Sequence, residues 1–334
     1  MRPSFAERLR CPKCRTPALV LSDVAEEDER EVRTGTLTCA SCGHAAPIAK
    51  GIADLLHDPP EFVRREAGGL ERFAEVMRND GWTRETLMQL PYVPDGYWYA
   101  QAVLMQQTLD TVAFQPGDTI LDVGSNTCWA AATFAQHGLE PTALDISTQL
   151  MQGLETADWH FDEKEVFFER VLGMMFDLPF ADRSFQYVWA CEVLHHNHRA
   201  NLARTYRELF RILAPGGQLI VANEPLRTLM TPKIDPGHEV REFEGHEHAY
   251  LRRSYTSLAR RAGFEVDVRG PRYHDTFQPG HSITLSERMR VDQLYRAATV
   301  MASRRSRRLR QALLAGRAYV MGGTALHMVC TRPG

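Results

Sequence analysis

Short apolar runs alternate with amphipathic stretches through the middle of the chain. Residues 120–123 read Ile-Leu-Asp-Val, Gly124 follows at once, and residues 129–137 are small and helix-prone. A second short apolar run, residues 143–144, leads directly into Asp145. This order predicts a strand, a tight turn, a helix and a second strand, with an acidic side chain closing each strand.

The same alternation continues toward the C-terminus. Residues 185–190 form an apolar run, and residues 201–213 place Leu, Tyr and Phe side chains at helical spacing before Ala-Pro-Gly-Gly ends the helix. Further strands are predicted at residues 218–222, 264–268 and 325–331, with a helix at 254–262 that ends at Gly263. Strands that alternate with helices indicate an α/β fold with a largely parallel sheet. Such a sheet presents the carboxyl ends of its strands to a nucleoside ligand.

Four of the seven cysteines form two Cys-x-x-Cys pairs near the N-terminus: Cys11 with Cys14, and Cys39 with Cys42. Two such knuckles supply four sulfurs for a tetrahedral zinc ion, and a site closed by four sulfurs is structural rather than catalytic. Disulfides are the alternative. Residues 19–24 and 34–38 are predicted to form a hairpin around this site, with the acidic residues 26–31 as its solvated tip.

Composition narrows the class of protein. The 334 residues carry a net charge of −3, so no overall basic field points to nucleic acid. No apolar run approaches the roughly 20 residues needed to cross a bilayer. The N-terminal residues lack the apolar core of a signal peptide. We therefore expect a cytoplasmic protein with no membrane partner, in which cysteines are reduced or bound to metal.

Four motifs, in order, resemble those of the class I S-adenosylmethionine (SAM) methyltransferases. They read LDVG, ALDIS, LPFADRSFQYVWACEVLHH and LAPGGQLIVANEP, and the resemblance covers roughly residues 114–273 and returns at the C-terminus. It implies a seven-stranded Rossmann-like sheet in which the last strand folds back between the fifth and the sixth. Residues 1–58 resemble the zinc-binding half of the small activator subunit of some tRNA and protein methyltransferases.

The predicted domain organisation follows from these resemblances. Residues 1–58 form a zinc ribbon, residues 59–113 form a helical linker that covers the cofactor, and residues 114–334 form the methyltransferase domain. Aromatic packing against the sheet is the alternative role for the linker. Helical or irregular insertions are expected at about 224–250 and 276–322.

The resemblance also implies the cofactor, SAM, and the residues that bind it. Asp145 is expected to accept hydrogen bonds from the ribose, and Asp122 to brace the first loop and the methionine amino group. Asn126 can adopt the left-handed conformation that glycine would otherwise supply. Where many relatives carry an acid that reads adenine, this chain has methionines, which are expected to pack on the ring; Asp177 lies three residues beyond them. The expected cofactor contacts are Asp122, Gly124, Ser125, Asn126, Asp145, Ile146, Met174, Met175 and Cys191.

Two consecutive histidines, His195 and His196, follow the fourth strand, at positions that face the acceptor in small-molecule relatives. A neutral imidazole is a suitable base for a hydroxyl group, so one of the two is expected to be catalytic in an O-methylation. A capping or core role is the alternative. Glu224 is placed at the mouth of the cleft. The stretch 245–250 is read as a lid over the acceptor, a solvated loop, or a metal site built on His246 and His248.

Three functions remain open at the level of the sequence. The first is methyl transfer to a small or medium-sized acceptor such as a natural product, a sugar or a peptide intermediate. The second is methylation of a ribosomal RNA base, supported by the zinc ribbon and the arginine run at 304–310 but opposed by the acidic pI. The third is a non-catalytic scaffold, motivated by the departures at Asn126, Cys128 and Met174.

Overall fold

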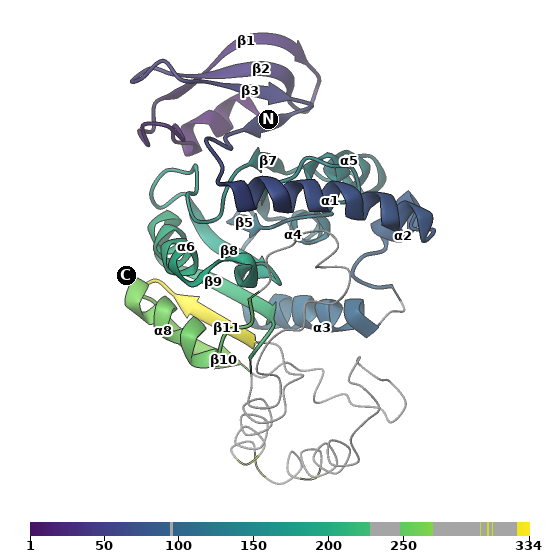
Figure 1. Ribbon diagram of the computed structural model, residues 1–334, viewed down its shortest axis with the longest axis vertical. Helices are drawn as coiled ribbons and strands as arrows, with labels where there is room; N and C mark the ends of the chain where they lie inside the picture. Colours follow the sequence, from purple (N-terminus) through teal and green to yellow (C-terminus); the bar gives the residue numbers. More distant parts are fainter. Residues whose placement is uncertain (94–95, 228–247, 270–300, 302–305, 307–308, 310–325) are drawn as a thin grey trace.

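A single mixed sheet organises the part of the chain that the computed structural model describes (Figure 1). The described residues are 1–93, 96–227, 248–269, 301, 306, 309 and 326–334. The sheet has eleven strands in the order β1-β2-β3-β4-β7-β6-β5-β8-β9-β11-β10. It is longer than the predicted sheet of seven strands, because four strands from the N-terminal residues continue it.

Strands are present at the six predicted ranges, and a further strand, β7, lies between β4 and β6. Strand β11 lies between β9 and β10 and is antiparallel to both, as expected for a last strand that folds back. β9 begins earlier than predicted, because Leu213 pairs with Phe185 before a register shift. The strands are β5 (Thr119–Val123), β6 (Glu140–Asp145), β7 (Glu169–Leu172), β8 (Phe185–Cys191), β9 (Leu213–Glu224), β10 (Glu265–Arg269) and β11 (Leu326–Thr331).

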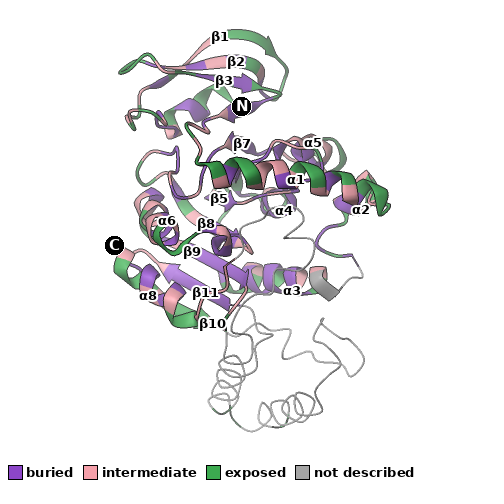
Figure 2. Cartoon of the chain, in the orientation of Figure 1, coloured by how far each residue is buried: buried purple, intermediate pink, exposed green. Residues whose placement is uncertain are grey.

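Helices cover both faces of this sheet, since successive residues of each central strand point to opposite sides. On one side Ile120 and Trp189 pack with α3 (Gly96–Thr111) and α4 (Trp129–Gln136), and α5 (Ala157–Lys164) lies next to α4. On the other side Leu121 and Val188 pack with α6 (Arg199–Ile212) and α8 (Arg252–Ala262). Figure 2 shows the central strands buried and the outward sides of α1, α6 and α8 exposed, whereas β1 at one end of the sheet is largely exposed.

The N-terminal residues extend the sheet instead of forming a separate body. After η1 (Pro3–Arg8) come β1 (Leu19–Glu27), β2 (Val32–Cys39), β3 (Ala45–Ala49) and β4 (Ile52–Asp54). The predicted hairpin is therefore confirmed, and its strands are longer than expected. β4 pairs in parallel with β7, with Ala53 opposite Val171. One apolar core contains Leu37 and Ile48 of this module together with Leu178 and Phe180, so both parts share a core.

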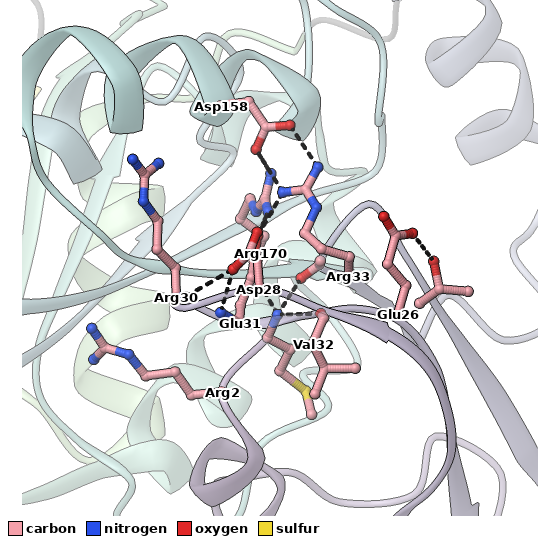
Figure 3. Close-up of polar contacts among 12 residues, drawn as sticks. Arg2, Glu26, Asp28, Arg30, Glu31, Val32, Arg33, Asp158 and Arg170 are labelled. Carbon is pink, nitrogen blue, oxygen red and sulfur yellow. Dashed lines mark hydrogen bonds and ion pairs between the residues drawn. The ribbon is translucent and has the colours of Figure 1, made fainter.

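A ring of four charged side chains crosses the junction between β2 and β7 (Figure 3). Arg170 of β7 is fully buried and pairs with Glu31, and also with Asp158 at 2.7 Å. Arg33 closes the ring through Glu31 at 2.7 Å and Asp158 at 2.9 Å. The prediction of a solvated acidic tip was therefore wrong for Glu31, whose side chain is 2% exposed. Its burial is compatible with its charge because two guanidinium groups flank it.

Three helices fill the predicted linker: α1 (Glu61–Asn79), α2 (Arg84–Met88) and α3. α1 ends at Asn79, directly before Asp80 and Gly81, and α2 ends at Met88, shortly before Pro91. Most of the predicted insertions and of the arginine run at 304–310 lie outside the described residues. Within the described residues, no helix is both long enough and apolar enough to cross a membrane.

Candidate active site

The loop between β5 and α4 is shaped by three left-handed residues: Gly124, Asn126 and Cys128, with φ of 68°, 46° and 59°. The expected left-handed conformation of Asn126 is confirmed. At Gly124 a Cβ atom would lie 2.2 Å from a methyl carbon of Val193, so the position requires glycine. The amides of Gly124 and Ser125 donate to the Leu144 carbonyl at 2.8 and 3.0 Å, which binds the loop to β6.

Two buried carboxylates hold this loop. Asp122 accepts from the Ser125 hydroxyl at 2.6 Å and from the Ala131 amide at 3.2 Å, so it braces the loop as expected. Asp145 accepts from the amides of Asn126 at 2.8 Å and Ser147 at 2.9 Å. Burial raises the pKa of Asp122 to about 7 and that of Asp145 to about 6, against the opposing effect of these hydrogen bonds.

An apolar wall lies beyond Asp145. Met174, Phe176 and Val63 of α1 form one buried cluster, and Ile146, Met175 and Phe62 pack against it. Asp177 faces away toward arginines: it lies 3.1 Å from Arg15, 3.2 Å from Arg204 and 3.7 Å from Arg10. Its charge therefore serves the contact between the loop after β7, the N-terminal module and α6.

Polar side chains gather at the carboxyl end of β8. Glu192 accepts from the side-chain amides of Gln101 and Asn223, each at 2.6 Å. The Cys191 thiol donates to the side-chain amide oxygen Oε1 of Gln101 at 2.7 Å, and burial raises the pKa of the thiol well above the usual value. Two left-handed residues, Glu192 directly after β8 and Asn223 near the end of β9, bring these groups together.

The two consecutive histidines occupy different environments. His195 is buried, with Nδ1 at 3.1 Å from Glu224, whose carboxylate also accepts from the backbone amides of Val193, Leu194 and His195. Glu224 is fully buried, so the prediction that it lies at the mouth of the cleft was wrong: these four contacts hold it beneath η3 (Leu194–His196). His196 faces Glu66 of α1, with 2.6 Å between Nδ1 and a carboxylate oxygen.

A cavity of about 670 Å³ joins these groups at the carboxyl ends of β5, β6 and β8. All nine residues expected to contact the cofactor line it, and so does His196, whereas His195 does not. Helix α1 roofs it with Phe62, Glu66 and Phe73. The lining residues that the sequence did not point to include Glu66, Gln101, Gln152 and Trp129. Trp98 of α3 also lines the cavity.

The stretch read as a lid or metal site is described only from His248 onward. The His248 amide donates to the His195 carbonyl at 2.9 Å, and the Tyr250 hydroxyl donates to the Asn197 carbonyl at 2.6 Å. These contacts hold residues 248–250, the end of this stretch, against η3 and Asn197.

The four N-terminal cysteines converge on one point. Their sulfur atoms all lie within 4.8 Å of one another, with 3.7 Å between Cys11 and Cys42 and 3.6 Å between Cys14 and Cys39. Sulfurs bound to one zinc ion at about 2.3 Å in tetrahedral geometry are about 3.8 Å apart, so the spacing fits zinc. Among the described residues, no other cluster of at least three Cys, His, Asp or Glu side chains has this geometry.

Solved structures similar to this chain include three of low sequence identity. The complex of the Haloferax volcanii Trm112 methyltransferase activator with a putative methyltransferase is 18% identical, with a TM-score of 0.48, over 83% of this chain and 99% of that one. Phosphoethanolamine N-methyltransferase 2 of Haemonchus contortus, in complex with SAM, is 17% identical, with a TM-score of 0.49, over 78% of this chain and 60% of that one. The [4+2]-cyclase SpnF is 21% identical, with a TM-score of 0.47, over 72% and 84%.

Curated relatives match the central part of the chain. The malonyl-[acyl-carrier protein] O-methyltransferase of Erwinia billingiae is 32% identical over 31% of this chain and 38% of the relative. A demethylmenaquinone methyltransferase of Corynebacterium efficiens is 33% identical over 36% and 47%, and the 27-O-demethylrifamycin SV methyltransferase of Amycolatopsis mediterranei 28% identical over 38% and 49%. The chain thus spans less than half the length of each of these relatives.

A family model described as a methyltransferase domain matches residues 121–221. This stretch runs from β5 to β9 and contains the loop, both carboxylates and the two histidines. Residues 121–221 are therefore similar to a methyltransferase domain, and the curated relatives that match this part of the chain are named as methyltransferases.

Proposed function

We propose that this chain transfers a methyl group from SAM to a hydroxyl group of a small or medium-sized acceptor. The observation that carries the proposal is the cavity, which is bordered by the β5–α4 loop, by Asp145, by an apolar wall and by an imidazole. These are the groups that a nucleoside-bearing methyl donor and a hydroxyl acceptor require side by side.

In this proposal the cofactor lies along the strand ends. Asp145 is fixed by two backbone amides and offers its remaining lone pairs to the ribose hydroxyls. Met174 and Met175, which were expected to pack on adenine, line the cavity together with Phe176 and Val63 and supply the apolar surface for the ring. Asp122, with Gly124 to Asn126, receives the methionine end. SAM supplies a methyl group on a positively charged sulfur, and the protein supplies orientation.

His196 is the proposed base, because it lines the cavity and His195 does not. A neutral imidazole there can accept the proton of an acceptor hydroxyl. His195, held by Glu224 beneath η3, is proposed to support the position of His196. The names of two relatives, a malonyl-[acyl-carrier protein] O-methyltransferase and a 27-O-demethylrifamycin SV methyltransferase, support a small-molecule or peptide-like acceptor.

We also propose a structural zinc ion on Cys11, Cys14, Cys39 and Cys42. The sulfur spacing supports zinc, and both knuckles lie in the module whose strands extend the sheet. Reduced, metal-bound thiols agree with a cytoplasmic location, which stays a prediction.

RNA methylation is the second candidate, favoured by one surface. Helices α6 and α8 pack side by side, and α8 carries four exposed arginines and no acidic residue: Arg252, Arg253, Arg260 and Arg261. Arginines of this kind can contact phosphates. Copurifying nucleic acid, and binding that weakens steeply with salt, would favour this candidate over the first.

The deciding experiment titrates SAM and S-adenosylhomocysteine (SAH) into the zinc-loaded protein by calorimetry. Dissociation constants on the order of 1 μM for both, about −8 kcal/mol, would support the proposed cofactor site. A screen of hydroxyl-bearing small molecules with SAM labelled at its methyl group would then identify the acceptor. Absence of binding for both ligands would contradict the proposal and support the non-catalytic alternative.

A further inference from the structure

Tryptophan side chains gather along one part of the cavity wall. The chain has five tryptophans, and four of them line the cavity: Trp82, Trp98, Trp129 and Trp189. They come from four places in the fold, namely the segment between α1 and α2, helix α3, the start of α4, and β8. All four pack in one apolar cluster. Together they form an aromatic wall that no single element supplies, here called the tryptophan compartment.

The rings of this compartment form a corner and not a flat stack. The Trp98 ring lies 6.5 Å from the Trp82 ring, at an interplanar angle of 58°, and 6.4 Å from the Trp129 ring, at 88°. A flat ring that stacks on one of two perpendicular rings presents its edge to the face of the other. Offset-stacked and edge-to-face arrangements are the ones that aromatic rings prefer. The corner of Trp98 and Trp129 therefore suits a planar aromatic group better than a puckered, saturated one.

The tryptophan compartment lies apart from the proposed adenine surface and next to the proposed methionine end of the cofactor. Met174, at the adenine surface, belongs to a different apolar cluster from the tryptophans. Trp129 begins α4, directly after the β5–α4 loop that is proposed to receive the methionine end. Trp189 lies on β8, two residues before Cys191. An acceptor beside the transferred methyl group would therefore meet this compartment.

The polar groups that border the compartment bond to one another. Gln101 lies about one turn after Trp98 on α3, and its side-chain amide donates to Glu192 at 2.6 Å and accepts from the Cys191 thiol at 2.7 Å. The side-chain amide of Asn223 donates to the same carboxylate at 2.6 Å. Since these hydrogen bonds fix the polar groups in place, ring faces are the main recognition surface that the compartment offers to an acceptor.

We infer that the acceptor is an aromatic hydroxyl compound and that Trp98 and Trp129 determine this specificity; the inference rests on the proposed function. The ring of the acceptor lies in the corner of the two indoles. Its hydroxyl points toward the end of β8, where Cys191, Glu192 and His196 line the cavity. A saturated alcohol of the same size gains burial but none of the ring contacts. The tryptophan compartment therefore selects flat aromatic acceptors over saturated ones.

The test compares naphthol with its fully saturated analogue, decahydronaphthol, which has the same carbon skeleton and hydroxyl group. Calorimetry on SAH-saturated protein gives both dissociation constants, and in the wild type naphthol should bind about tenfold more tightly or better. Trp98→Leu keeps an apolar side chain without the ring and should reduce this preference by about threefold or more. Trp98→Phe keeps a ring and should retain most of the preference. Equal affinities in the wild type, or binding of neither alcohol, would overturn the inference.

Trp159→Leu is the matched control. Trp159 lies on α5 and does not line the cavity, and the Arg84 guanidinium lies 5.8 Å from its ring centroid. The same substitution there should leave the preference for naphthol unchanged. An equal loss of preference in Trp159→Leu and Trp98→Leu would contradict the assignment of the ring to the tryptophan compartment.

Titration of SAH alone, and of both alcohols without SAH, separates this inference from the proposed function. If the wild type binds no SAH but still prefers naphthol, the proposed function fails and the ring preference of the compartment stands. If it binds SAH and does not distinguish the two alcohols, only the inference fails.

Discussion

At the scale of single residues, Gly124 is the position where the cofactor loop tolerates least change. Its φ of 68° disfavours any other residue, and an added Cβ would lie 2.2 Å from a methyl carbon of Val193. Gly124→Ala should therefore displace Val193 or the loop and weaken SAH binding by about tenfold or more, roughly 1.4 kcal/mol. Calorimetry measures this loss directly.

Gly117→Ala is the matched control for that variant. Gly117 has a φ of 85°, but nothing lies within 4 Å of a Cβ placed there. It should lose about 1 kcal/mol of stability from backbone strain and keep its SAH affinity. Equal affinities in the two variants would show that contact with Val193 is irrelevant to the cofactor.

The raised pKa of Asp122 predicts that cofactor binding depends on pH. With a pKa of about 7 in the free protein, Asp122 is mostly protonated at pH 6. The ammonium group of SAH, bound beside it, would favour the carboxylate and lower this pKa, so binding releases a proton and affinity rises from pH 5.5 to about pH 7.5. Calorimetry in buffers of different ionisation enthalpy measures the release, and Asp122→Asn should abolish it. Proton uptake by the wild type would contradict the proposed position of the ammonium group.

The sequence allowed the conformation of a residue to be predicted where that conformation depends on the residue itself. Asn126 was expected to be left-handed, because asparagine tolerates that conformation, and its φ of 46° agrees. Cys128 adopts the same conformation without any such tendency, and nothing in its neighbours indicated it. Glu66 and Gln101 reach the cavity from helices far away in sequence, so only the packing of α1 and α3 reveals them.

At the scale of elements, the loop after β7 links the metal site to the apolar wall of the cavity. Arg10 and Arg15 directly flank the Cys11–Cys14 knuckle, and both contact Asp177, two or three residues beyond Met174 and Met175. Arg10 also pairs with Glu208 of α6 at 2.6 Å. The knuckle therefore holds two cations against the loop that carries the proposed adenine site.

Removal of zinc should consequently weaken SAH binding. Without the metal the knuckle is free to open, Arg10 and Arg15 move, and the loop after β7 loses its anchor; we expect a loss of about three- to tenfold, roughly 1 kcal/mol. Calorimetry before and after chelation measures it. Asp177→Asn should have a similar effect that chelation does not increase, whereas Asp182→Asn, an exposed acid on the same loop, should have none. Unchanged affinity after complete zinc loss would refute the link.

Elements with a clear pattern of apolar residues were predictable from the sequence. The junction between the N-terminal module and the main domain was not. The strands β5, β6 and β8 were recognisable because each contains a short apolar run. β4 is only three residues long, which is too short to show an alternation of apolar and polar residues. Its parallel pairing with β7 was therefore not predicted. Glu31 looked like one more acid in an exposed run, because its partner Arg170 lies far away in sequence.

At the scale of the whole molecule, the shared sheet predicts that the zinc module and the main domain unfold together. Arg170 is the central side chain of their junction, fully buried between Glu31 and Asp158. Arg170→Leu would leave a buried Glu31 with one cation fewer, at a cost of about 3–5 kcal/mol. Arg8→Leu, which breaks the exposed pair with Glu140, should cost less than about 1 kcal/mol.

Urea unfolding followed by two probes tests this unity. All five tryptophans lie beyond residue 58, so their fluorescence reports the main domain, and zinc captured by a coloured chelator reports the N-terminal module. In the wild type both signals should change at the same urea concentration, and in Arg170→Leu both should shift together to a lower one. Zinc release well before the change in fluorescence would show that the module unfolds alone. The continuous sheet would then not couple the stability of the module to that of the main domain. Coincident transitions would instead make the metal site part of the same cooperative unit as the cavity, which is what the contacts of Arg10, Arg15 and Arg170 require.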